Sequence, residues 1–232
     1  MEVHKESRKP SCRTVREEDL HKDLERFRAK ALELGASAAE VIPTSFVVVE
    51  ERVWMKCLVP RCFGIRDGGS PYCPPHTPHP DFMRKVFSQY HWSVLFKRNV
   101  EPLGDYIPTS KTRAEEMLSQ RGQPKEGQRF HEKTWEIVGQ LESYAQSKGY
   151  DLAMGFSGGN CKFNLCHGAT CGVIENGNCR FPLQARPSME AVGIDVFDLA
   201  TKVGWDVYMI RSVEPELNVI PCAVSIGIVF IY

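Results

Sequence analysis

The sequence has no excess of charge of either sign. Its 232 residues contain 29 lysines and arginines and 29 aspartates and glutamates, so the formal net charge is zero. The basic residues are scattered among acidic ones instead of forming a basic tail or patch, and such a patch is the usual electrostatic footprint of a nucleic-acid-binding domain. We therefore expect no nucleic-acid partner, and an anionic partner would have to be bound locally.

Long hydrophobic runs are also missing. The longest apolar segment, residues 219–232, is interrupted by Pro221 and is shorter than the roughly 20 residues that span a bilayer. The first six residues are polar, and no apolar segment typical of a secretion signal follows them. We expect a cytoplasmic protein with no membrane association, in which residues 219–232 form a buried strand.

Nucleotide-binding loops and short metal-binding turns are absent too. The sequence contains neither Gly-x-Gly-x-x-Gly nor Gly-Lys-Ser/Thr, so nothing indicates nucleotide chemistry. It also contains no Cys-x2-Cys, the turn on which structural zinc sites are commonly built. No internal repeat is present beyond the Cys-x4-Cys with which each of two cysteine-rich stretches begins.

Cysteine, by contrast, is abundant, and seven of the nine cysteines fall into two groups. The first group is Cys57, Cys62 and Cys73, and the second is Cys161, Cys166, Cys171 and Cys179. An odd, unevenly grouped set in a reducing cytosol is not typical of a disulfide framework. Thiolates are soft ligands that favour zinc, copper(I) or iron–sulfur clusters over magnesium or calcium. We interpret the remaining two, Cys12 and Cys222, as a tail residue and a core residue.

The second group has the features of a loop that wraps an iron–sulfur cluster. Its four cysteines are spaced x4, x4 and x7, among glycines that allow close backbone approach, and Pro182 follows the last of them. A [4Fe–4S] cluster is the favoured cofactor, while zinc and a purely structural or redox thiol role remain alternatives. Arg180 and Arg186 flank the end of this group and either offset the charge of a bound cluster or are ordinary surface residues.

The first group has only three thiols, followed by Pro74 and Pro75. A [4Fe–4S] cluster there needs a fourth ligand or leaves one iron open, and an open iron can act as a Lewis acid on a substrate. His76 and His79 are the nearest candidate ligands, and His167 stands beside the second group. Each histidine is equally compatible with a solvated loop position.

Hydrophobic periodicity predicts an α/β fold with a mixed central sheet and flanking helices, and an α+β arrangement is also compatible. We expect a flexible tail at residues 1–14 and a single domain at 15–232, with cysteine loops at 57–80 and 158–187. The predicted helices are 15–34, one starting at Pro80, 111–120, 130–148, one starting at Pro187 and 196–203; the predicted strands are 45–55, 92–96, 150–156, 206–211 and 223–231. Residues 101–128 are predicted to be a surface excursion. Both cysteine groups would then follow the C-terminal end of a strand, where open α/β sheets place their sites.

Five motifs together resemble an uncharacterised family of predicted metal-binding proteins. They are Cys57–Cys62, Tyr72–His76, Gly158–Cys161, Cys179–Pro182 and Ala185–Val196. The resemblance covers roughly residues 40 to 232. Members of the family are similar small cytosolic proteins, mainly of anaerobic bacteria and archaea, thought to carry iron–sulfur clusters. The resemblance implies that Cys57, Cys62, Cys73, Cys161, Cys166, Cys171 and Cys179 are the ligand set, and it implies no particular reaction.

The leading functional hypothesis is an iron–sulfur protein that carries low-potential electrons in anaerobic metabolism, through one or two [4Fe–4S] clusters and with a redox partner protein. One alternative is an enzyme that uses an open iron at the three-cysteine group for sulfide transfer or small-substrate activation. The other is a zinc-stabilised interaction module. Whether the protein is an enzyme, and its oligomeric state, are left open by the sequence.

Overall fold

The computed structural model describes residues 15–62, 65, 69–100, 110–112, 131–209 and 216–232. The predicted tail at 1–14 lies outside the described residues, and so does most of the predicted excursion at 101–128 with its short helix at 111–120.

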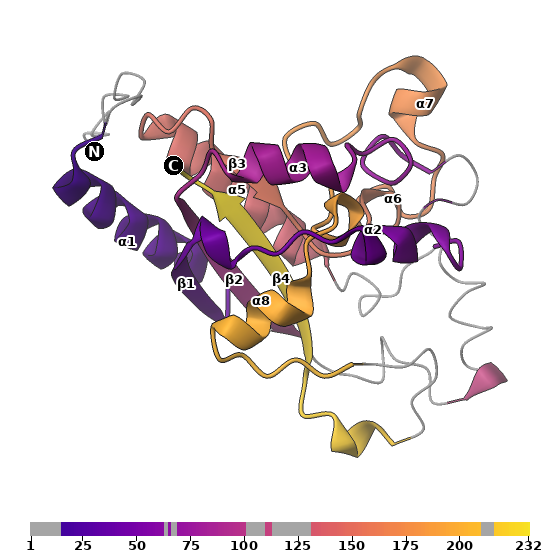
Figure 1. Cartoon of the computed structure of the whole chain (residues 1–232). Coiled ribbons are helices and arrows are strands. Elements are labelled where there is room, and N and C mark those ends of the chain that lie inside the picture. The colour runs from indigo at the N-terminus through magenta and orange to yellow at the C-terminus, as the bar shows by residue number, and fades with distance from the viewer. Residues whose placement is uncertain (1–14, 63–64, 66–68, 101–109, 113–130, 210–215) are drawn as a thin grey trace, which may run out of the picture.

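Helices surround a four-stranded sheet (Figure 1). The α-helices are α1 (Glu17–Glu33), α2 (Glu51–Leu58), α3 (Pro80–Phe87), α5 (Glu132–Ser147), α6 (Cys161–Asn164), α7 (Gly172–Asn176) and α8 (Val196–Lys202). Three 3-10 turns are η1 (Thr44–Phe46), η5 (Glu190–Val192) and η6 (Leu217–Val219). The strands are β1 (Ala38–Pro43), β2 (Trp92–Val100), β3 (Met154–Phe156) and β4 (Ala223–Phe230). Within the described residues, no helix combines the length and apolarity that crossing a membrane requires.

The strands lie in the order β1-β2-β4-β3, and every neighbouring pair is antiparallel. The predicted combination of helices with a central sheet is confirmed, although the strand directions are antiparallel throughout and not mixed. The mixed sheet was expected because helices alternate with strands along the sequence, which often reflects parallel crossovers. Here α2 and α3 both intervene between β1 and β2, yet the chain re-enters the sheet at the end where it left, because Trp92 at the start of β2 lies opposite Pro43 at the end of β1.

Both faces of the sheet are covered. Along β2, Val94 and Phe96 pack with α1 and α5, whereas Leu95 packs on the opposite face with α3 and α8. This period-2 alternation is what a strand buried on both faces requires. The predicted helix at 15–34 is confirmed as α1, which buries Leu20, Leu24, Phe27 and Ala31 and is followed by Gly35 at a φ of 107°. The predicted helix at 130–148 is confirmed as α5.

Three predicted elements differ in the structure. The predicted strand at 45–55 is wrong, because β1 ends at Pro43, residues 45 and 46 belong to η1, and residues 51–55 are the start of α2. The apolar, β-branched composition suggested a strand, but Val53 and Trp54 share one partly buried side with Cys57 and Leu58, which is helical spacing. The predicted strand at 150–156 is reduced to β3, and residues 206–209 form no strand.

Candidate metal centre

The first cysteine segment, residues 57–80, begins inside a helix. Cys57 lies near the end of α2, so the expectation that both cysteine groups follow strands is wrong for this one. The amide of Cys62 donates to the Cys57 carbonyl oxygen at 2.9 Å, and the amide of Cys73 donates to the Ser70 carbonyl oxygen at 3.1 Å. Cys73 is buried, while Cys57 and Cys62 are partly exposed. The segment is therefore a folded loop with local turns at its thiols.

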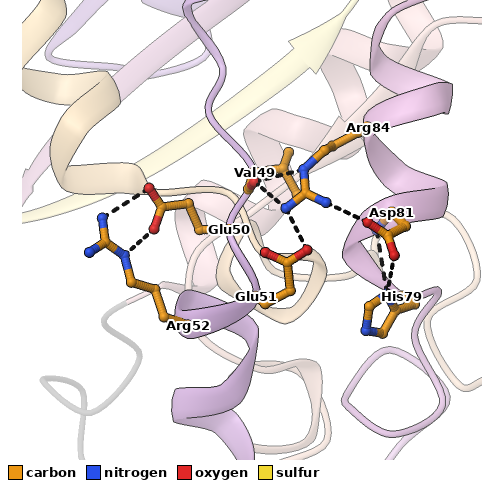
Figure 2. A network of polar contacts seen from close by, with 7 residues as sticks. All are labelled: Val49, Glu50, Glu51, Arg52, His79, Asp81 and Arg84. Carbon is orange, nitrogen blue, oxygen red and sulfur yellow. Dashed lines mark hydrogen bonds and ion pairs between the residues drawn. The ribbon is translucent and has the colours of Figure 1, made fainter.

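A network of hydrogen bonds and ion pairs links the helices at the two ends of this segment (Figure 2). The Arg84 guanidinium, on α3, donates to the Val49 carbonyl oxygen at 2.8 and 3.0 Å and forms ion pairs with Glu51 at 2.7 Å and Asp81 at 2.6 Å. Glu51 starts α2 ahead of Cys57, and Asp81 starts α3 after Cys73. Arg84 thus joins α3 to the start of α2, the helix that contains Cys57, and Cys62 and Cys73 lie in the stretch between these two helices.

The two histidines of this segment lie outside its buried centre. His76 and His79 are both exposed. His79 caps α3, where its Nδ1 atom lies 3.5 Å from Asp81 Oδ2, and its ring packs edge-on against Trp54. The side chain of His79 is therefore engaged at the start of a helix.

The second cysteine segment, residues 158–187, begins in close contact with the buried ring of His131. A Cβ atom at Gly159, which has a φ of 67°, would lie 2.5 Å from the His131 ring, and one at Gly158 would lie 3.0 Å from it. The sequence Gly158-Gly159 is thus dictated by the close approach of the His131 ring and, at Gly159, by a positive φ that L-residues rarely adopt. The strand β3 leads into this glycine pair, as the sequence predicted.

Two short helices position the thiols of the second segment. Cys161 is the first residue of α6, whose cap is formed by Asn160 accepting from the Phe163 amide at 3.0 Å. Cys171 is the residue that precedes α7, and Gly177 ends that helix in the left-handed conformation. Cys161 is buried, whereas Cys166, Cys171 and Cys179 are partly exposed.

The two cysteine segments meet at Ser70. The Ser70 hydroxyl donates to Cys73 Sγ at 3.6 Å, and Cys161 Sγ donates to the same hydroxyl oxygen at 3.5 Å. One sulfur comes from each segment, and both are buried. In Figure 1, α2, α6 and α7 accordingly lie on the same side of the molecule, beyond one end of the sheet. The two groups, which are about a hundred residues apart in sequence, form one site.

A small apolar group anchors this site to the fold. Trp135 of α5 is fully buried against Cys161 and Leu165, and Tyr72 and Cys179 pack around the same group. Tyr72 belongs to the first segment, so the apolar contact joins the two segments as the Ser70 hydrogen bonds do. The backbone amide of Phe181 also donates to Cys179 Sγ at 3.4 Å, a kind of bond that stabilises a thiolate bound to a metal.

The thiols of the two segments influence one another electrostatically. The pKa of Cys161 is raised to about 12, mainly by burial and also by the neighbouring thiols of Cys73, Cys166 and Cys171, against the hydrogen bond from Ser70. Burial also raises the pKa of Cys57 to about 12, with Cys62 adding to the effect. Several thiolates so close together repel one another, and bound cationic metal reverses that balance.

Arginine charge reaches one edge of the site. Burial raises the pKa of Cys166, while a hydrogen bond and the charge of Arg180 oppose the rise. Arg180 also donates to the Thr170 carbonyl oxygen at 2.5 Å and pairs with Glu175 at 2.9 Å. Of the two predicted arginines, Arg180 therefore faces a thiol. Arg186 forms an ion pair with Glu142 at 2.6 Å and so links the end of the second segment to α5.

Buried polar atoms without hydrogen-bond partners are a further indication that these residues fit a thiolate-bound metal group. Five buried side-chain polar atoms among the described residues have no hydrogen-bond partner, and three of them are at this site. They are Trp135 Nε1, packed in the group that contains Cys161, His167 Nδ1, next to Cys166, and Glu190 Oε2, whose charge reaches Cys57. Buried polar atoms without partners are rare, and an unfilled binding position is one reason for them. The residues present therefore fit a metal group held by thiolates.

The spacing of the donors is looser than a single ion requires. Among the described residues, no three side chains of histidine, cysteine, aspartate or glutamate are grouped closely enough to hold one metal ion. A zinc–sulfur bond of about 2.3 Å would bring the sulfurs of a tetrahedral site to within about 4 Å of one another. The Cys73 and Cys161 sulfurs instead contact the Ser70 oxygen that lies between them.

The family described as predicted metal-binding protein (DUF2284) matches residues 40–224. The chain belongs to this family. The match includes all seven cysteines of the two segments and confirms the resemblance drawn from the motifs. No curated protein and no solved structure matches the chain.

Sequence reasoning did not single out three residues that the structure places at this site: Ser70, Trp135 and Glu190. Ser70 and Trp135 carry no pattern that separates them from ordinary loop and helix residues. Glu190 lies within the motif Ala185–Val196, so its neighbourhood was identified but the carboxylate was not. Cys222, predicted to be a core residue, is partly exposed just before β4.

Proposed function

We propose that this protein binds [4Fe–4S] clusters and carries low-potential electrons between partner proteins in the cytoplasm. The observation that supports the proposal is the meeting of the two cysteine segments at Ser70, whose hydroxyl contacts the buried sulfurs of Cys73 and Cys161. The second segment has the four thiols that a fully ligated cluster needs. Two clusters held side by side in this way would form a short path for electrons.

The spacing of the thiols favours iron–sulfur clusters over zinc. A four-iron cluster is larger than one ion, so its ligand sulfurs stand farther apart than those of a zinc site, and among the described residues no three donors are grouped closely enough to hold one ion. Trp135 Nε1 is a buried donor without a partner in the group around Cys161. Hydrogen bonds from such donors to cluster sulfurs tune the reduction potential.

A redox partner has an apolar surface available next to the second segment. Ile174, on α7, is 48% exposed, and Leu183, four residues after Cys179, is 76% exposed. Docking at this place would bring the partner's redox group close to the bound cluster. Exposed apolar residues beside a functional site are a feature of protein-binding surfaces.

The second candidate function is an enzyme with an open iron, and it is favoured by the first segment. That segment offers three thiols, and its two histidines are exposed, with His79 engaged at the start of α3. An iron without a fourth thiolate would bind sulfide or a small substrate as a Lewis acid. Electron transfer at the second segment and substrate binding at the first are compatible in one protein.

Anaerobic purification followed by iron, acid-labile sulfide and zinc analysis tests the proposal. We expect about eight irons per chain for two clusters and about four for one, with an EPR signal after reduction. A colourless protein with zinc and no iron would rule out both candidate functions and leave the zinc-stabilised module.

The variant Cys73→Ser separates the two groups. If both segments hold clusters, this variant removes or alters one EPR species and preserves the other. Cys222→Ser is the matched control, because this cysteine lies outside both segments, and it should leave both species unchanged. Perturbation of the signal by added sulfide or small thiols would favour the enzyme, and an inert spectrum would favour the electron carrier.

A further inference from the structure

A carboxylate from a distant part of the chain lies against the first cysteine segment. Glu190 is the first residue of η5, and the turn that carries it is fastened on two sides. The Glu50 amide, at the start of α2, donates to the Gly193 carbonyl oxygen at 2.8 Å. The Thr77 hydroxyl, four residues after Cys73, donates to the Ala191 carbonyl oxygen at 2.7 Å. Glu190 is therefore held between the helix that carries Cys57 and the stretch that follows Cys73.

One carboxylate oxygen of Glu190 has the environment of a candidate metal ligand. Its Oε2 atom is buried and has no hydrogen-bond partner. The carboxylate also accepts hydrogen bonds from its own backbone and from Ser188, and no lysine, arginine or histidine of the described residues is among the groups that act on it. The turn η5 that carries it packs against α2, the helix in which Cys57 lies. A buried carboxyl with no cation beside it is costly unless it is neutral or bound to a metal.

We propose that Glu190 is the fourth ligand of the metal group held by Cys57, Cys62 and Cys73, an inference that rests on an iron–sulfur cluster at the first segment, as in the second candidate function proposed above. The thiols of this group number three, and the two nearby histidines are exposed. Glu190 is half-buried, and the fold brings its carboxylate, with a buried Oε2 atom, toward the group from another segment. Its Oε2 atom supplies the missing donor.

An oxygen ligand gives this group a property that a fourth cysteine would not give. Carboxylate is a harder donor than thiolate and binds soft, sulfur-ligated iron less strongly. A small thiol or sulfide can then replace the carboxylate at that iron, while the three thiolates remain bound. The ligand class that Glu190 would yield to is therefore a small sulfur compound.

Two substitutions test this assignment. Glu190→Gln keeps the shape of the side chain but removes its charge, and Glu190→Cys offers a thiolate in place of the oxygen ligand. Glu40→Gln is the matched control, because Glu40 is an exposed carboxylate on β1. Each protein is purified anaerobically, its iron and sulfide are counted, and its EPR spectrum is recorded after reduction with and without added 2-mercaptoethanol.

We expect Glu190→Gln to shift the EPR signal of the first-segment species or to lose about one iron per chain, with the second-segment species unchanged. We expect Glu190→Cys to retain the iron, with a changed first-segment signal that no longer responds to the thiol, whereas the wild-type signal responds. Glu40→Gln should match the wild type in every measurement.

The proposal is overturned if wild-type protein contains iron but both Glu190 variants give its iron count, spectrum and thiol response. A wild-type protein without iron would instead refute the proposed function, so the two failures are distinguishable. The second-segment signal reports folding in every sample. If Glu190→Gln loses both signals, Glu190→Cys decides, since recovery of both species supports a ligand role and continued loss indicates a role in folding.

Discussion

Ser70 shows how much of the site depends on a single small side chain. Its hydroxyl contacts Cys73 Sγ and Cys161 Sγ, and it is itself fully buried. A serine hydroxyl has one hydrogen to donate and two lone pairs, so it can serve one sulfur as donor and the other as acceptor only while one thiol keeps its proton. Once both sulfurs are thiolates, the hydroxyl can donate its one hydrogen to only one of them.

We expect Ser70→Ala to lower the reduction potential of the cluster whose sulfur loses the hydrogen bond, because hydrogen bonds to sulfur stabilise the reduced, more negative state. The lost hydrogen bond should also lower the free energy of unfolding by about 1 kcal/mol. An EPR-monitored redox titration and a urea titration measure the two effects. Ser88→Ala is the control, because that hydroxyl bonds the Lys85 carbonyl oxygen of its own helix. Equal potentials in the two variants would contradict the role of Ser70.

His131 makes stability depend on pH. Burial lowers its pKa from 6.5 to about 4, and its Nδ1 atom lies 2.7 Å from the Ser225 hydroxyl oxygen. The unfolded chain therefore takes up a proton near pH 6.5, whereas the folded protein does so only near pH 4. The contribution of His131 to the free energy of unfolding is constant above pH 6.5. It falls by about 3 kcal/mol in total as the pH falls toward 4.

Urea titrations between about pH 7 and pH 4.5, inside the window set by these two pKa values, measure this dependence. The free energy of unfolding of the wild type should fall over this range. His131→Gln should show a flatter profile, because the glutamine takes up no proton. Parallel profiles for the two proteins would mean that other groups cause the pH dependence.

At the scale of elements, the second cysteine segment is shaped by the glycine pair above His131. Gly159 combines a φ of 67° with a close contact to a ring, whereas Gly177 has a φ of 81° with no atom within 4 Å of its hypothetical Cβ. A substitution at Gly159 therefore tests backbone strain together with a steric clash, whereas one at Gly177 tests backbone strain alone.

Gly159→Ala should lower the free energy of unfolding by about 2 to 4 kcal/mol, because a left-handed alanine and a crowded Cβ both cost energy. Gly177→Ala should cost only about 1 to 2 kcal/mol, which is the strain alone. Urea titration gives both values, and iron content reports whether the second segment still binds its metal. Equal costs for the two variants would show that the His131 ring moves aside easily.

The sequence predicted α1, α5, β2 and β4 because each carries a regular apolar period over many residues. It failed at residues 45–55, whose valines and aromatic side chains favoured a strand by composition, although residues 51–55 begin α2 and the burial of that helix follows a helical period. It also predicted the seven cysteines as a set. It could not predict Ser70 or Glu190 as neighbours of those thiols, because their places depend on contacts between segments that are far apart in sequence.

At the scale of the whole molecule, the site is separate from the main core. The two large apolar groups on the faces of the sheet contain none of the seven cysteines, and the site has its own small group around Trp135. Metal and fold are therefore coupled mainly through the two cysteine segments, while the sheet with α1 and α5 has its own buried core.

Removal of metal with a chelator should consequently loosen the site before the sheet. We expect a lower Tm, because metal that binds only the folded state stabilises it. Hydrogen exchange measured by mass spectrometry should show faster exchange in residues 57–80 and 158–187, with α1, α5, β2 and β4 still protected. Equal acceleration throughout the chain would contradict a separate site.

The position of β4 has a consequence for biosynthesis. This strand pairs with β2 on one side and β3 on the other, although it follows both in sequence. While the ribosome has not yet released residues 223–230, β3 has no strand to pair with, and the second cysteine segment that follows it has no fixed base. Iron delivered to the nascent chain at that stage would meet unpaired thiols instead of a formed site. We therefore expect cofactor insertion to follow the emergence of β4, with the thiols kept reduced until then.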